Sequence, residues 1–99
     1  MIRCVIVEDE EMARKVLKSL LAQYCPDVMV CAEADDITSG QEMIEAFRPD
    51  LVFLDIEMPC MSGIELARRL KEANENISIF FVTAYENYAL DAFSVKALG

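Results

Sequence analysis

The chain alternates between short apolar runs and longer segments in which apolar residues recur every three or four positions. Short apolar runs favour β-strands, and the periodic segments favour helices that bury one face. Pro, Asn and Asp separate many of these segments and mark turns between them. The predicted strands occupy residues 2–7, 28–32, 51–55 and 77–82, and residues 95–99 are typical of the approach to a fifth strand.

Helices are predicted between successive strands. The first runs from about residue 11 to residue 24. The second opens after the polar turn at residues 34–36 and ends at residues 48–50, because the residue before a proline leaves helical conformations. The third follows the strand at 51–55 and fades at residues 74–76. A short last helix is expected to carry Tyr85, Ala89, Ala92 and Phe93.

Two of these helices have capping signals at their starts. Ser39 and Glu42 have the spacing of a capping box in the second helix, although Thr38 is an equal candidate for the cap. Ser62 and Glu65 have the same spacing at the start of the third helix.

The alternation of strands and helices with short connections predicts an α/β fold, a doubly wound parallel sheet. The run 51–54 is continuously apolar, which favours a strand buried on both faces. Pro59 cannot extend a central strand, so this strand is expected to end near Asp55. Open parallel sheets bind ligands at the carboxyl ends of their strands, so Asp55 is expected to stand in that crevice.

Composition narrows the possible functions. The 99 residues form one small domain or part of one, with a formal net charge of −9 that argues against nucleic-acid binding by this segment alone. No apolar run approaches the roughly 20 residues needed to span a bilayer, and the N-terminus lacks a signal-peptide pattern. We therefore expect a cytoplasmic protein.

The four cysteines do not predict a zinc site. Cys4, Cys25, Cys31 and Cys60 lack CxxC spacing, and the chain has no histidine. We expect them to be reduced and structural, with Cys60, in a loop, the most accessible.

Three acidic residues follow two of the predicted strands. Glu8 and Asp9 come directly after residues 2–7, and Asp55 ends the strand at 51–55, so the three carboxylates are expected to face one another across a few ångströms. Such a cluster needs a cation or a raised pKa, and oxygen ligands without His or Cys select a hard ion such as Mg²⁺. Beside that ion Asp55 could attack a phosphoryl group, with the Thr83 hydroxyl bonding a phosphoryl oxygen.

Each position also has a purely structural interpretation. The acids at residues 8–11 could simply complement the dipole of the helix that follows. Asp55 could be a strand-end cap, and Thr83 could cap a helix through a capping box with Glu86. The joint placement of an acid pair, a lone acid and a hydroxyl at three strand ends favours the functional interpretation.

With these residues in place, the chain resembles the receiver domain of two-component response regulators, whose fold is flavodoxin-like. Residues 5–10 (VIVEDE) resemble the acidic pair after the first strand of that family. The stretch from Asp55 through Met58 and Pro59 to Gly63 resembles its phosphorylation-site signature, and residues 82–84 resemble its switch strand. The similarity covers essentially all 99 residues.

The resemblance implies a signalling switch rather than an enzyme acting on a separate substrate. Asp55 is then the phosphoacceptor, which receives its phosphoryl group from a sensor histidine kinase. Asp9 binds Mg²⁺ directly, Glu8 mostly through water, and Glu57 through its backbone carbonyl. Thr83 swings toward the phosphoryl oxygen.

Residues 81–90, with the pairs at 92–93 and 97–98, are similar to the LytTR branch. In that branch a β-rich DNA-binding domain follows the receiver, so contact with DNA is expected only through a downstream output domain.

The family carries a lysine on strand five, and no residue here matches it, because Lys96 is too early. We therefore expect residues 1–99 to be a receiver domain truncated at its C-terminus, missing most of strand five and the last helix. An exposed edge strand then favours a homodimer or edge-strand association.

Three other functions compete with a phosphoacceptor switch. A haloacid-dehalogenase type of enzyme also uses an Asp nucleophile and Mg²⁺, but it wants a second acid two residues after the nucleophile and a Thr two residues beyond that, where this chain has Glu57 and Pro59. A flavodoxin-like nucleotide binder needs Gly, Ser or Thr in the first loop, where this chain has acids. A degenerate receiver that acts only as a dimerisation module is disfavoured by the intact set of acids.

Overall fold

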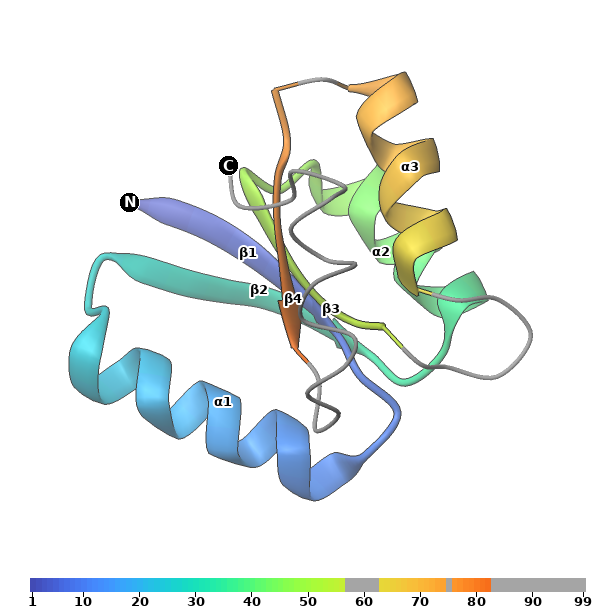
Figure 1. Ribbon diagram of the computed structural model, residues 1–99. Helices are drawn as coiled ribbons and strands as arrows, with labels where there is room; N and C mark the ends of the chain where they lie inside the picture. Colours follow the sequence, from blue (N-terminus) through green and yellow to red (C-terminus); the bar gives the residue numbers. More distant parts are fainter. Residues whose placement is uncertain (57–62, 75, 83–99) are drawn as a thin grey trace.

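The computed structural model describes residues 1–56, 63–74 and 76–82, in which strands and helices alternate along the chain (Figure 1). The elements are β1 (Ile2–Val7), α1 (Glu11–Tyr24), β2 (Val28–Ala34), α2 (Ile37–Phe47), β3 (Leu51–Asp55), α3 (Gly63–Ala73) and β4 (Ser78–Val82).

The four strands form one parallel sheet in the order β2-β1-β3-β4. The strands β1 and β3 lie side by side at its centre, with Val7 opposite Leu54 in the register. The two strands therefore end at the same level, and the residues that follow them emerge next to each other. The predicted α/β fold with a doubly wound parallel sheet is confirmed.

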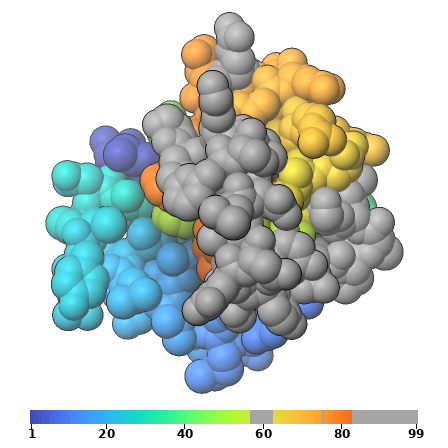
Figure 2. All heavy atoms as spheres, in the orientation of Figure 1, coloured from blue at the N-terminus to red at the C-terminus, as the bar shows by residue number. Residues whose placement is uncertain are grey.

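Helices cover both faces of this sheet (Figure 1). Side chains alternate across a strand, so successive residues of β1 contribute to two separate apolar cores. The core beneath α1 contains Cys4, Ile6, Leu21 and Leu51. The larger core beneath α2 and α3 includes Val5, Val7, Val52, Leu54, Leu66 and Ile79. In Figure 2, α1 and α3 lie on opposite sides of the molecule.

The helix α1 turns only part of its apolar surface toward the sheet. Leu21 is buried and Leu17 packs against the same core. Met12, Val16 and Tyr24, which share the helical apolar pattern, are exposed. The apolar stripe read from the sequence is thus wider than the surface that α1 buries.

Strand β2 continues two residues beyond the predicted end at residue 32. Glu33 interrupts the apolar run, so the sequence pattern of the strand ends at residue 32. Within the described sheet β2 is an edge strand, and the Glu33 carboxylate pairs with Lys18 of α1 at 2.8 Å, so a charged residue is tolerated at this position.

The prediction of the cap on α2 was wrong. The N-cap is Asp36, whose carboxylate accepts hydrogen bonds from the Ser39 backbone N–H at 2.7 Å and from its hydroxyl at 2.8 Å. Ser39 is therefore the partner of the cap, and Thr38 is already inside the helix. These hydrogen bonds lower the pKa of Asp36. The helix ends as predicted, with Arg48 in a left-handed conformation before Pro49.

Several predictions fall outside the described residues. These are the Ser62 cap, the accessible Cys60, the helix carrying Tyr85 and Phe93, and the start of a fifth strand at residues 95–99. Cys4, Cys25 and Cys31 are free thiols, and Cys4 is fully buried, which raises its pKa to about 11. Within the described part of the chain, no helix combines the length and apolarity that a membrane span requires.

Gly40 allows α2 to pack closely on β1, and replacing it with alanine is expected to destabilise the fold. A Cβ atom at this position lies 2.9 Å from Cγ1 of Val7, inside normal contact distance. Alanine in a helix normally gains about 1 kcal/mol over glycine, but overpacking a rigid core costs about 1–3 kcal/mol. Urea unfolding should show a net loss for Gly40→Ala and almost no change for the neighbouring Gln41→Ala. A rise in stability for Gly40→Ala contradicts this account.

Candidate metal centre

Three carboxylates from two strands meet at one edge of the sheet. Glu8 and Asp9 follow β1, and Asp55 is the last residue of β3. The adjacent register of these strands carries all three side chains to the same place, where one carboxylate oxygen of each lies within 4.8 Å of the others. The convergence predicted from the sequence is therefore present in the structure.

The three acids differ in their exposure to solvent. Glu8 is only 8% exposed, whereas Asp9 is exposed and Asp55 is half-buried. The Glu8 backbone N–H donates to the Ala34 carbonyl of β2 at 3.0 Å, and its carboxylate accepts the Glu10 backbone N–H at 3.2 Å. Glu8 is therefore the anchored member of the cluster, and Asp9 is the member that faces solvent.

Burial raises the pKa of Glu8 to about 8. The hydrogen bond from the Glu10 N–H opposes this shift, while hydrogen bonds with the Asp9 and Asp55 side chains and the charge of Asp55 add to it. Without a cation, Glu8 thus keeps a proton at neutral pH. The proton relieves a repulsion that amounts to about 4 kcal/mol for two carboxylates 4 Å apart at an effective dielectric of 20.

The donor set suits a hard divalent cation. All three side chains offer oxygen, and the cluster contains no nitrogen or sulfur ligand. Mg²⁺ prefers one or two carboxylates completed by waters and phosphate oxygens, and the exposure of Asp9 leaves the cluster open to such ligands. The negative charge of the three carboxylates can therefore be reduced either by a proton on Glu8 or by a bound divalent ion.

The start of α3 is pressed against the backbone of Asp55 through Gly63. The Gly63 N–H donates to the Ile56 carbonyl at 2.5 Å. A Cβ atom on residue 63 lies 2.8 Å from Cα of Ile56 and overlaps the carbonyl oxygen of Asp55, so only glycine fits this approach. The sequence motif included this glycine without indicating that it packs directly on Asp55.

The structural interpretation of the first acidic run accounts for only part of it. Glu10 is the N-cap of α1 but makes no side-chain capping hydrogen bond, and Glu11 is the only acid in the first turn. Glu8 and Asp9 instead belong to the carboxylate cluster. Glu57 and Thr83, the other two predicted site residues, lie outside the described part of the chain.

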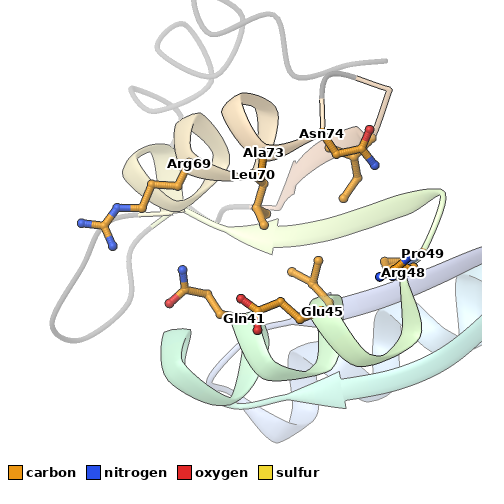
Figure 3. A pocket seen from close by; sticks show the side chains of 10 residues that line it. Gln41, Glu45, Arg48, Pro49, Arg69, Leu70, Ala73 and Asn74 are labelled. Atoms are coloured by element: carbon orange, nitrogen blue, oxygen red, sulfur yellow. The ribbon is translucent and has the colours of Figure 1, made fainter.

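A separate cleft of about 450 Å³ lies between α2 and α3 (Figure 3). Its lining includes Gln41, Glu45 and Arg48 on one side and Leu70 and Ala73 on the other. None of the three clustered acids lines it. Its lining is both charged and apolar, and it lies apart from the carboxylates.

Comparison with known sequences identifies related proteins. A family model described as a response regulator receiver domain matches residues 4–99. The sensory transduction protein LytT of Bacillus cereus is 42% identical over 98 residues, covering 99% of this chain and 39% of that protein. An uncharacterized response regulatory protein of Vibrio cholerae is 42% identical over 94 residues, covering 95% of this chain and 36% of its own length. The chain thus spans less than half the length of these curated relatives.

Solved structures share the fold. The response regulator protein TrrA from Thermotoga maritima, in complex with Mg²⁺-BeF, has a TM-score of 0.83 and 32% identity, covering 99% of this chain and 82% of that chain. A DNA-binding response regulator of the LuxR family from Staphylococcus aureus has a TM-score of 0.84 and 28% identity. The match covers 98% of this chain and 82% of that chain. Together with the LytT relatives, these confirm the predicted receiver fold and the likeness to the LytTR branch.

The raised pKa of Glu8 makes the stability of the metal-free protein depend on pH. Between the ordinary pKa of 4.5 and the folded-state pKa of about 8, the folded protein binds more protons than the unfolded chain. The contribution of Glu8 to the free energy of unfolding is therefore present below pH 4.5 and is lost as the pH rises to about 8.

Urea unfolding in the presence of a chelator, repeated across this pH range, checks the expectation. Glu8→Gln keeps a neutral polar side chain and should flatten the decline in stability. Glu72→Gln replaces an exposed carboxylate elsewhere and should leave the decline as in the wild type. An identical pH profile for wild type and Glu8→Gln rules out the assignment of the proton to Glu8.

Proposed function

Because this chain belongs to the response regulator receiver family, we propose that it is a phosphoacceptor switch of a two-component system, in which Asp55 accepts a phosphoryl group from a sensor histidine kinase. The observation that carries this proposal is the meeting of Glu8, Asp9 and Asp55 at the carboxyl ends of β1 and β3. Residues 1–99 form the receiver domain in this proposal.

Asp55 is the nucleophile. One oxygen of its carboxylate forms a bond to phosphorus while the bond from phosphorus to the kinase's histidine nitrogen breaks, and the electron pair of that bond leaves with the imidazole. The product is an aspartyl phosphate on Asp55. The position of Asp55 at a strand end, half-buried and beside the exposed Asp9, supports access from solvent.

Mg²⁺ is the proposed cofactor. Asp9, Glu8 and Asp55, with the backbone carbonyl of Glu57, are the residues that hold it. When bound, the ion neutralises the negative charge that keeps an incoming phosphoryl group away from the carboxylates. Glu8 has to lose its proton before its carboxylate can serve as a ligand, so proton and ion compete for the same group.

The output is a change in conformation near the end of β4. Thr83 is proposed to donate its hydroxyl to a phosphoryl oxygen and so to bias an existing equilibrium between two states. The switch acts in the cytoplasm, and the controlled output is transcription through a downstream DNA-binding domain of the LytTR kind. Two copies associate through an edge strand in this proposal, which adds a second means of regulation.

Phosphorylation of Asp55 can be tested with acetyl phosphate, a small phosphoryl donor, in the presence of Mg²⁺. Intact mass spectrometry is expected to show one phosphoryl adduct on the wild-type protein and none on Asp55→Asn, because the amide is not a nucleophile of this kind. Asp27→Asn, an exposed aspartate far from the cluster, should be modified as the wild type is. An equal adduct on Asp55→Asn overturns the proposal.

Metal binding by the cluster is tested separately by titration calorimetry with Mg²⁺ alone. Asp9→Asn is expected to weaken binding by at least roughly tenfold, since even residues that only support metal ligands are worth about 10–100-fold. Asp27→Asn again serves as the control. Equal affinity for Mg²⁺ in wild type and Asp9→Asn contradicts the proposed ligand set.

A further inference from the structure

The arginine at position 14 of α1 reaches the loop that carries two of the clustered acids. Its Nη1 donates a hydrogen bond of 2.7 Å to the backbone carbonyl of Glu8. The side chain of Arg14 is only 18% exposed, although Arg14 belongs to a surface helix. It therefore lies between α1 and the end of β1 rather than in solvent.

This contact completes the restraint of Glu8. Its backbone N–H is held by Ala34 of β2, its carboxylate by the Glu10 N–H, and its carbonyl by Arg14. Glu8 is the first residue after β1, which ends at Val7, and its N–H is still bonded to β2. The Arg14 hydrogen bond thus holds the backbone carbonyl at the point from which the Glu8 and Asp9 side chains emerge.

Arg14 is itself held in place from β2. Its Nε lies 3.4 Å from Glu33 Oε1, and the other carboxylate oxygen of Glu33 pairs with Lys18 at 2.8 Å. Glu33 stands opposite Ile6 in the register, one position before Ala34, so the anchor comes from the strand that also binds the Glu8 N–H. Strand β2 therefore holds the Glu8 backbone in two ways: directly through the Ala34 carbonyl, and indirectly through the ion pair of Glu33 with Arg14.

The two contacts of Arg14, with the Glu8 carbonyl and with Glu33, depend on the planar shape of its guanidinium group. Arg14 makes two contacts at once: its Nη1 donates to the Glu8 carbonyl, and its guanidinium forms an ion pair with Glu33, with Nε 3.4 Å from Oε1. A lysine has the same charge, but its single nitrogen is a point donor without the planar fork of arginine. Replacing Arg14 with lysine therefore keeps the positive charge and removes the planar geometry of the donor group.

We propose that Arg14 is a positioning residue for the metal centre: held by Glu33, it fixes the Glu8 backbone so that the Glu8 and Asp9 carboxylates are presented to a divalent cation. This inference rests on the proposed function, because it concerns the same Mg²⁺ site. It assigns to Arg14 no contact with the ion or the phosphoryl group.

A purely electrostatic role for Arg14 predicts the opposite effect. A positive side chain beside a cation site repels the ion, so removing it should strengthen Mg²⁺ binding. The positioning role predicts that removal weakens binding, because ligands lose their orientation. The sign of the change in affinity therefore distinguishes the two.

The test is Mg²⁺ titration calorimetry on wild type, Arg14→Gln and Arg14→Lys, with urea unfolding in a chelator to measure each variant's stability without metal. Both substitutions are expected to weaken Mg²⁺ binding by roughly tenfold. Lys15→Gln, which breaks an exposed ion pair with Glu11 in the same helix, should bind as the wild type does. Arg14→Lys preserves charge and most of the side-chain volume, so it remains measurable if Arg14→Gln is too unstable to study.

Several outcomes overturn the inference. Unchanged or tighter Mg²⁺ binding by Arg14→Gln excludes positioning, and wild-type affinity in Arg14→Lys excludes the need for the guanidinium fork. If the wild type binds no Mg²⁺, the metal site of the proposed function fails, and this inference fails with it. If the wild type binds Mg²⁺ but acetyl phosphate leaves Asp55 unmodified, the phosphoacceptor role fails while the positioning of the metal site by Arg14 is still decided by the affinities.

Discussion

The pairing of β1 with β3 is the constraint on which the candidate site depends. Four successive residues of β1, from Cys4 to Val7, are fully buried and alternate between two cores, so a shift of one position would exchange the two sets of side chains. Burying each such side chain contributes about 1.5–3 kcal/mol, and several are buried along these two strands. This total outweighs a carboxylate repulsion of about 4 kcal/mol, so the core fixes the register and the register forces the acids together.

The enforced proximity leaves the cluster with two ways of lowering its charge. A proton on Glu8 is one, and burial favours it by raising the pKa of Glu8 to about 8. A divalent cation is the other, and it has to displace that proton. The buried carboxylate therefore makes the site responsive to cations, whereas the exposed Asp9 keeps it open to solvent.

The sequence predicted the order of the elements and the convergence of the three acids because both follow from local patterns. Residues 51–54 are apolar throughout, Glu8 and Asp9 directly follow one strand and Asp55 ends another, so a parallel sheet is enough to bring them together. The extent of β2 was not predictable in this way, since Glu33 is accommodated by Lys18 of a different element. The Asp36 cap was missed because Ser39 offers an equally good local pattern.

The parts of the site that escaped prediction are the contacts between layers. Arg14 looks like any charged residue of a surface helix, and nothing in its spacing indicates that it hydrogen-bonds the Glu8 carbonyl six residues earlier. The requirement for glycine at position 63 was also not predictable from spacing. It arises because the start of α3 packs directly on the Asp55 backbone, which depends on the position of α3 in the fold.

These two contacts reach the cluster from opposite faces of the sheet, because α1 and α3 cover different cores. The backbone beside Glu8 is held from one layer, and the backbone of Asp55 is pressed by the other. Each helix thus touches backbone that carries one of the carboxylates. The backbone on each side of the carboxylate cluster is therefore in direct contact with one of the two helical layers.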